Sequence, residues 1–288
     1  MKRRQLTATA AATLLALMSP WAAAQDIPKK TLTLVVGFAA GGAADTGARV
    51  IAKKLAENLG QTVVVDNRAG AGGNLAHQHV ARANPDGATI LLGSIGPLAI
   101  APHLMKLPYD AQRDLAPLTL GMSFPNVLVV HSGVRAKTLA EFVALAKAKP
   151  GGLDFASTGA GSASHLAGEL FNLRAGIDTV HIPYKGGAPA LQDLLGGRVS
   201  AYYSTWSTAQ PHVESGKLVA LASTGLSRPE FLPNLPTIAE AGYPGFAATN
   251  WYAFVAPGAT PPAVLERWNK ELVKALNAPE VKAELLKH

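Results

Sequence analysis

The chain contains no cysteine among its 288 residues, which excludes a disulfide scaffold, a thiol nucleophile and a cysteine-ligated metal or cluster. Charged residues are also scarce, at 16% against a usual share of about a quarter. Apolar residues make up 48%, which is too much for a disordered chain, and glycine (28) and proline (20) are plentiful. The length allows one large domain or two ordinary ones, with many tight loops.

Positive charge exceeds negative charge, with 26 Lys and Arg against 19 Asp and Glu and a formal balance of +7. The basic residues are scattered, and no run of five or more occurs. The sequence also lacks the interleaving of aromatic and basic residues that stacks single-stranded bases. We therefore expect no nucleic-acid partner.

The N-terminus has the three parts of a secretory signal peptide: a basic start at Met1–Arg4, an apolar run at Leu6–Met18 and an Ala-x-Ala site at Ala22–Ala24. The alternative is a membrane anchor, but the apolar run is too short to span a bilayer comfortably. Cleavage near Ala24 would leave 264 residues with a balance of +4. We expect residues 1–24 to be removed and the mature protein to be exported, with no insertion into the membrane.

Strand-like and helix-like segments alternate from Thr31 onward, which predicts an α/β protein. The helix predicted after residue 42 ends at Gly60, a second series begins near Asn126, and Thr138 with Glu141 forms a capping box. Thr260 is the expected N-cap of the last clear helix. The predicted strands are 32–38, 62–65, 88–92, 126–131, 153–156, 179–182, 199–203, 218–222 and 249–256.

Three of the strand-to-helix joints are rich in small residues: Phe38–Asp45, Ser157–Ser162 and Tyr184–Gly187. Glycine allows close approach of a ligand to the backbone, and the free N–H groups at a helix start favour anions. Ligands of open α/β sheets collect at these carboxyl ends of strands. The three joints together predict an anion or carboxylate site, the alternative being that each is only a tight turn. Asp45 is interpreted as a helix-start carboxylate.

Motifs for cofactors and catalysis are missing. Neither a G-x-G-x-x-G nor a P-loop pattern occurs, and no H-E-x-x-H metal motif is found. There is no G-x-S-x-G elbow around Ser162, although a secreted α/β serine hydrolase using that serine stays open as an alternative. We expect no cofactor, no metal site and no catalytic residues.

The chain resembles the Bug-type (TctC) family, the periplasmic substrate-binding receptors of tripartite tricarboxylate transporters. The resemblance runs from about Pro28 to Lys287, and its motifs are specific in their order. They are residues 34–42 (LVVGFAAGG) with Asp45, 65–74 (VDNRAGAGGN), 85–87 (PDG), 107–110 (LPYD), 181–187 (HIPYKGG), 194–197 (LLGG) and 235–242 (LPTIAEAG).

This resemblance implies a two-lobed periplasmic-binding-protein type II fold with a central ligand cleft. Lobe 1 would be 25–125 plus 249–288, and lobe 2 would be 126–248, with crossovers near Asn126 and Thr249. Family ligands are mostly small carboxylates, held by loop backbone amides, hydroxyls and bridging waters. The ligand-binding residues carried over are Phe38, Ala39, Gly41, Gly42, Asp45, Ser94, Ser157, Thr158, Gly159, Gly161, Ser162, Tyr184, Gly186, Gly187, Ser204 and Trp206.

The implied function is a monomeric periplasmic receptor that binds a di- or tricarboxylate or an aromatic carboxylate and delivers it to membrane transporter subunits. A carboxylate-sensing component of a signalling system is an alternative. Many relatives carry Asp-Asn where this chain has Ser204 and Thr205, so an acid that could receive an amino group is missing. Tyr203 and Trp206 would suit an apolar or aromatic carboxylate.

The C-terminus is the second departure from the family. Relatives usually continue with a further strand and a long helix that packs on the first lobe, whereas this sequence stops at Lys287-His288. A truncated reading frame or a fragment would explain the difference; if the omission is real, we expect apolar surface on lobe 1 to be left uncovered.

Overall fold

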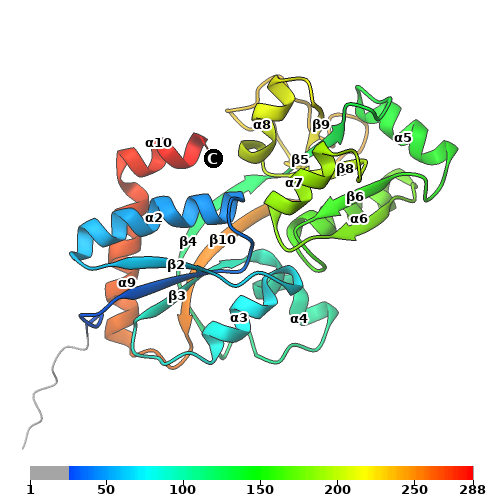
Figure 1. The fold of residues 1–288 in the computed structure, drawn as a ribbon. Coiled ribbons are helices and arrows are strands. Elements are labelled where there is room, and N and C mark those ends of the chain that lie inside the picture. Colours follow the sequence, from blue (N-terminus) through cyan, green and yellow to red (C-terminus); the bar gives the residue numbers. More distant parts are fainter. Residues whose placement is uncertain (1–25, 288) are drawn as a thin grey trace, which may run out of the picture.

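The structure, a computed structural model, describes residues 26–287, so the expected signal peptide lies outside the described residues. Two five-stranded sheets form two lobes, which lie side by side in Figure 1. We call them lobe 1 and lobe 2. Lobe 1 has the order β2-β1-β3-β10-β4 and lobe 2 the order β7-β6-β8-β5-β9. The α/β class and the two-lobed architecture predicted from the sequence are confirmed.

The strands of lobe 1 are β1 (Leu32–Val36), β2 (Val63–Asn67), β3 (Thr89–Ser94), β4 (Leu115–Pro125) and β10 (Thr249–Pro257). Those of lobe 2 are β5 (Val127–His131), β6 (Asp154–Ser157), β7 (Val180–Pro183), β8 (Ala201–Ser204) and β9 (Leu218–Ser223). In each lobe three strands are parallel, and one strand that enters from the other lobe pairs antiparallel with its two neighbours.

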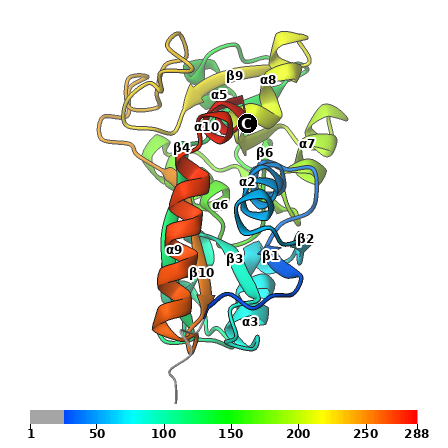
Figure 2. The same ribbon diagram turned by 90° about the vertical axis from the view of Figure 1, so that its left-hand side faces the viewer.

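Helices cover the sheets of both lobes. Lobe 1 has α2 (Ala43–Leu59), α3 (Asn74–Ala81), α4 (Ala101–Leu104), α9 (Pro262–Asn277) and α10 (Pro279–Lys287), with one-turn segments η1 (Ala71–Gly73) and η2 (Gly96–Ile100). Lobe 2 has α5 (Leu139–Ala148), α6 (Ala163–Ala175), α7 (Gly187–Leu195) and α8 (Trp206–Glu214). Figure 2 shows α9 running along lobe 1 beside β4 and β10. Between residues 26 and 287, no helix is both long and apolar enough to cross a bilayer.

Each lobe has its own hydrophobic core. In lobe 1, α2 and α9 bury apolar side chains such as Ile51 and Trp268, and the Trp268 indole N–H donates to the Gly87 carbonyl at 2.9 Å. In lobe 2, Phe155 and Phe171 are buried at the centre. Full burial of such side chains stabilises each lobe by about 2 kcal/mol per side chain. The two cores keep the loops between them in place.

Local signals set most helix ends as expected. Gly60 ends α2 in the left-handed conformation (φ 62°), and the Thr138 hydroxyl caps α5 by accepting the Glu141 N–H at 3.2 Å. The expectation for α9 was wrong, because Pro261 occupies the N-cap position and the Thr260 hydroxyl has no partner. Proline fixes its own φ near the helical value, which favours a start at this point.

The chain crosses between the lobes at two neighbouring points, residues 125–126 and 248–249. Thr224 joins these crossovers: its hydroxyl accepts the Asn126 N–H at 2.9 Å and donates to the Ala248 carbonyl at 2.8 Å. Thr224 is completely buried. The crossovers are therefore tied together, while the loops at the ends of β1, β6 and β7 lie between the lobes.

Candidate functional site

A small cavity lies between the lobes, where the strands of both sheets end. It measures about 20 Å³, little more than one water molecule needs, so the lobes are closed around it. Lobe 1 contributes Phe38, Ser94, Asn250 and Tyr252 to its lining. The crossover and lobe 2 contribute Asn126, Thr158, Ser162, Ala163, Ser164, Tyr202, Tyr203 and Thr205.

Within residues 26–287, two buried donors of this cavity lack a hydrogen-bond partner. They are the Ser94 hydroxyl and the Asn126 side-chain amide nitrogen, and both residues are less than 5% exposed. Buried polar groups in proteins are almost always paired, and an unpaired one costs about 1–3 kcal/mol. The acceptor oxygen of a bound ligand or of a water molecule would satisfy both donors.

Ser94 is held in position by a buried histidine. The Ser94 N–H donates to His77 Nε2 at 3.4 Å, and His77 Nδ1 lies 2.9 Å from the Gly73 carbonyl. Burial lowers the pKa of His77 to about 4, so the ring is neutral and serves as donor on one side and acceptor on the other. His77 is thus a structural support for the cavity.

Hydroxyl groups cluster at the start of α6, on the lobe 2 side of the cavity. The Ser162 hydroxyl caps α6 by accepting the His165 N–H at 3.3 Å and lies 3.1 Å from the Ser164 hydroxyl. Ser164 in turn accepts the Thr158 N–H at 2.9 Å. In the part of the chain that the structure describes, no imidazole nitrogen is hydrogen-bonded to the Ser162 hydroxyl, whereas a serine hydrolase needs such a general base.

Four aromatic side chains, Phe38, Tyr202, Tyr203 and Tyr252, also line the cavity, and they are neutral. Burial raises the pKa of Tyr252 to about 12, and burial likewise raises the pKa of Tyr202 and Tyr203, so all three phenols stay protonated. No charged side chain belongs to the twelve residues that line the cavity. A ligand carboxylate would therefore meet neutral N–H and O–H donors rather than a cation.

Most of the predicted glycines lie at the contact between the lobes and not in the cavity. The Ala39 N–H donates to the Lys185 carbonyl across the cleft at 3.0 Å, beside Gly186. A Cβ at Gly159 would lie 2.7 Å from the backbone nitrogen of Gly72 in the opposite lobe. The predicted residues at or beside this contact are Ala39, Gly41, Gly42, Gly159, Gly161, Gly186 and Gly187.

Asp45 does not line the cavity but holds the backbone of the joint Phe38–Asp45 in place. Its carboxylate is buried and accepts hydrogen bonds from the Gly41 N–H (3.0 Å), Arg49 (3.0 Å) and the Asn67 amide (2.9 Å). The Asn67 amide also donates to the Phe38 carbonyl at 3.1 Å. Burial alone would raise the pKa of Asp45, but these donors outweigh it and hold the pKa below its usual value. The charged carboxylate thereby fixes the loop that carries Phe38.

Four further predicted residues also lie outside the cavity lining. Ser157 contacts His181, Tyr184 donates to Asp193, and the Ser204 hydroxyl donates to the Thr205 carbonyl. Trp206 lines a different pocket. Of the predicted set, Phe38, Ser94, Thr158 and Ser162 line the cavity.

Asn126, Asn250, Tyr202 and Tyr252 line the cavity but were not predicted. Asn126 carries a signal that could have been used, because it is a polar residue between Pro125 and the apolar run 127–130. The other three lie inside strands, where the sequence does not show which side chains meet the other lobe.

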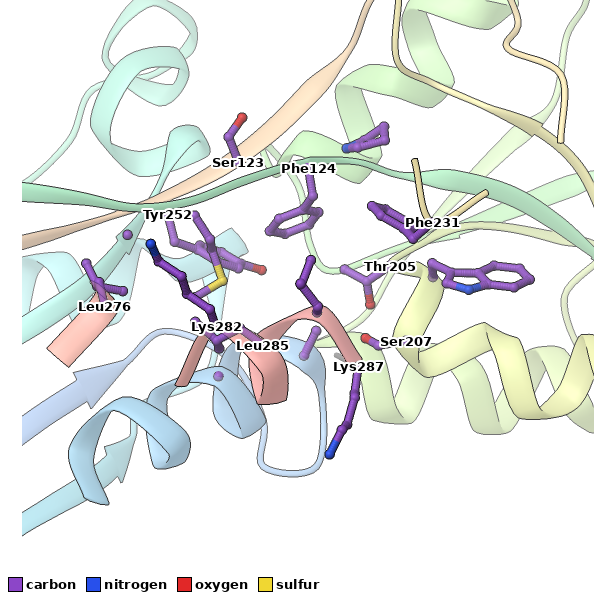
Figure 3. A pocket seen from close by; sticks show the side chains of 17 residues that line it. Ser123, Phe124, Thr205, Ser207, Phe231, Tyr252, Leu276, Lys282, Leu285 and Lys287 are labelled. Atoms are coloured by element: carbon purple, nitrogen blue, oxygen red, sulfur yellow. The ribbon is translucent and has the colours of Figure 1, made fainter. Parts of the chain in front are cut away.

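The pocket that Trp206 lines is larger, about 400 Å³, and mostly apolar (Figure 3). It lies beside α10 and is separated from the cavity by Thr205 and Tyr252, which line both. Its apolar wall includes Met122, Phe124 and Leu285, and Lys282 and Lys287 also belong to its lining. Its lining is mostly apolar and its two lysines belong to α10, whereas two unpaired buried donors face the smaller cavity, so we take the smaller cavity as the candidate carboxylate site.

Comparison with known proteins agrees with this geometry. The sequence profile described as "Tripartite tricarboxylate transporter family receptor" (TctC) matches residues 47–288. Protein BugT of Bordetella pertussis is 41% identical over 260 residues, which are 90% of this chain and 80% of BugT.

Solved structures of similar proteins share the fold over 90% of this chain. R. palustris Rpa4515 with adipate is 35% identical, with a TM-score of 0.85, over 90% of this chain and 87% of that chain. MatC (Rpa3494) from Rhodopseudomonas palustris, solved with bound malate, is 34% identical, with a TM-score of 0.86, over 90% and 89%. With the profile match over most of its length, the chain belongs to the Bug-type (TctC) family of periplasmic solute-binding receptors and is a binding protein rather than an enzyme.

Proposed function

We propose that this protein closes its two lobes on a small carboxylate and delivers it to a tripartite tricarboxylate-type transporter. The observation that carries the proposal is the pair of buried, unpaired donors on Ser94 and Asn126, which face one cavity between the lobes. Carboxylate oxygens are acceptors only, so they match two donors. The bound adipate and malate in the two similar proteins support this class of ligand.

The proposed ligand is a di- or tricarboxylate or an aromatic carboxylate and not a zwitterionic amino acid. None of the twelve described residues that line the cavity is acidic, and the Asp45 carboxylate is already occupied by three donors. An ammonium group would therefore be buried without a counter-charge, which is costly. The rings of Phe38 and Tyr252, whose centroids are 6.4 Å apart, offer apolar surface to the body of the ligand.

We further propose where the receptor acts and how its lobes move. The protein would be exported with cleavage near Ala24 and act as a monomer in the periplasm. Its lobes would be 25–125 plus 249–288 and 126–248, and closure would be a hinge rotation at the crossovers that Thr224 joins.

A thermal-shift screen of the mature protein tests the ligand class. The panel is malate, adipate, citrate, benzoate and glutamate. A ligand present at a hundred times its Kd stabilises the folded state by about 2.7 kcal/mol. We expect at least one carboxylate without an amino group to raise the melting temperature. A panel in which no carboxylate raises it contradicts the receptor function, and glutamate as the best ligand contradicts the narrower class.

Replacing Ser94 by alanine tests the unpaired donor directly. We expect the affinity for the best ligand of the screen to fall about tenfold, the value of one hydrogen bond to a charged group. The free protein should keep its stability, because the removed hydroxyl has no partner in it. Calorimetric titration measures the affinity.

The matched control is Ser207→Ala. The Ser207 hydroxyl is also buried and unpaired, but it lines the larger apolar pocket. We expect this variant to bind with the affinity of the unaltered protein. Equal losses in both variants would show that the Ser94 hydroxyl does not contact the ligand.

A further inference from the structure

Two histidines stand behind the loop Ser157–Ser162, which carries part of the cavity wall. The Gly161 N–H donates to His165 Nδ1 at 3.1 Å, and the Gly159 N–H donates to the Ser157 hydroxyl at 3.0 Å. The Ser157 hydroxyl itself lies 2.6 Å from His181 Nε2. Two backbone N–H groups of the loop are thus held, directly or through Ser157, by imidazole nitrogens.

The geometry fixes the tautomer of His165 and disfavours a positive charge on both rings at once. His165 Nδ1 must be unprotonated, because it accepts the Gly161 N–H. The two imidazole rings stack with centroids 3.9 Å apart and planes inclined by 28°, so two positive charges there would repel each other strongly. On its other side His181 stacks on Phe155 at 5.1 Å, an apolar ring that offers no compensation for a charge.

Of the titratable groups around the pair, Glu169 favours protonation of His165, while Tyr203 is neutral and Asp154 is engaged elsewhere. On α6, Glu169 lies 3.7 Å from His165 Nε2, but its side chain is 47% exposed. On β8, Tyr203 packs edge-on against Phe155 and stays neutral, since burial raises its pKa. On β6, Asp154 accepts the Ser200 N–H and is occupied there.

The loop that the histidines hold is also the one that meets lobe 1. A Cβ built on Gly159 would lie 2.7 Å from the backbone nitrogen of Gly72. A Cβ built on Gly96 would lie 2.6 Å from the carbonyl oxygen of Gly161. A small change in the path of the loop would therefore disturb both the cavity wall and the contact between the closed lobes. The hydroxyls of Thr158 and Ser162 would move with it.

We propose that His165 and His181 are positioning residues for ligand binding: their neutral rings hold the loop Ser157–Ser162 in its ligand-binding shape, and protonation of His165 on acidification removes the acceptor of the Gly161 N–H and releases the ligand. This inference rests on the proposed receptor function. Acid would then weaken ligand binding because His165 is protonated, in addition to any effect of protonating the ligand.

The direction of the pH effect follows from burial. Burial lowers the pKa of His165, with Glu169 opposing, and burial together with the charge of His165 lowers the pKa of His181 to about 4. An unfolded chain takes up these protons already near pH 6.5, the ordinary histidine pKa. The stabilising contribution of the neutral pair is therefore present above about pH 6.5 and is lost as the pH falls towards 4.

The test uses the mature protein, first without ligand. We would follow the Gly161 amide by ¹H–¹⁵N NMR from about pH 8 to about pH 4. The expected result is a shift of the Gly161 amide that follows the titration of the His165 ring. In His165→Asn, whose side-chain oxygen replaces Nδ1 as acceptor and does not titrate, the amide should not follow such a titration. A Gly161 amide that ignores the His165 titration in the unaltered protein overturns the proposal.

The second arm measures malate affinity by calorimetry at about pH 7.5 and about pH 5. His165→Asn corrects for the titration of malate itself, and we expect the unaltered protein to lose about tenfold more affinity than this variant. His165→Phe, which keeps a ring without an acceptor, should bind weakly at both pH values. Equal losses in the unaltered protein and in His165→Asn overturn the proposal. If malate does not bind, this arm uses the best carboxylate of the thermal-shift screen; if no carboxylate of the panel binds, the proposed function is wrong, and the amide titration alone decides the role of His165.

Discussion

Gly96→Ala is expected to weaken ligand binding by about 10- to 100-fold while leaving the free protein at least as stable. Gly96 is the first residue of η2 and does not have a left-handed backbone. An alanine Cβ there would lie 2.6 Å from the Gly161 carbonyl oxygen and 3.3 Å from Ser162 Cα, both in the opposite lobe. Forcing one methyl group into a packed contact costs about 1–3 kcal/mol. With the lobes apart this clash is absent, so the cost falls on closure.

Two measurements separate closure from folding in this variant. Calorimetric titration with the best carboxylate of the screen gives the affinity, and thermal unfolding without ligand gives the stability. The matched control is Gly196→Ala, because Gly196 has an ordinary backbone (φ −79°) and its nearest neighbours belong to its own lobe. An unchanged affinity in Gly96→Ala would mean that ligand binding does not need the closed contact seen here.

Asp45→Ala is expected to lower the free energy of unfolding by about 2–3 kcal/mol and to weaken ligand binding as well. The substitution leaves the Gly41 N–H without its acceptor and frees Asn67, which also holds the Phe38 carbonyl. Removing one partner of a buried ion pair costs about 3–5 kcal/mol. We expect the lower figure because the Arg49 side chain is 55% exposed and is hydrated after the change. The loop that carries Phe38 into the cavity loses its support.

Urea unfolding at neutral pH measures this loss. Donors hold the pKa of Asp45 below its usual value despite burial, so its contribution is complete above about pH 4 and disappears as the pH falls through the lowered pKa. Glu57→Ala is the control, since Glu57 forms an exposed pair with Lys54 and should change stability by less than about 0.5 kcal/mol. If both variants were equally stable, Asp45 would not be the support of the loop.

Local patterns were sufficient for much of the fold. The apolar run at 32–36 and the helical spacing after residue 42 identify β1 and α2, since burial on a sheet or a helix face repeats with a fixed period. The strand β4 (Leu115–Pro125) was not predicted. Pro117 and Gly121 interrupt its alternation of apolar and polar residues. Leu120 is apolar but exposed, so the sequence does not show which face of the strand is buried. Its position at the sheet edge, paired only with β10, explains why such a sequence is tolerated.

The sequence indicated where the candidate site lies but not which residues line it. The three glycine joints do lie between the lobes, because the carboxyl ends of parallel strands share one edge of a sheet. Asn126 and Tyr252 were missed, because a side chain within or beside a strand enters the cavity only through the relative placement of the two sheets.

The sequence by itself determined the α/β class, the strand-to-helix joints and the scarcity of charge around them, because these depend on residue types and spacings along a short stretch of chain. Only the tertiary structure decided that Gly159 and Gly186 meet backbone of the opposite lobe while Ser94 and Asn126 keep unpaired donors in the cavity. These residues lie far apart in the chain, and their contacts exist only when both lobes are folded and closed.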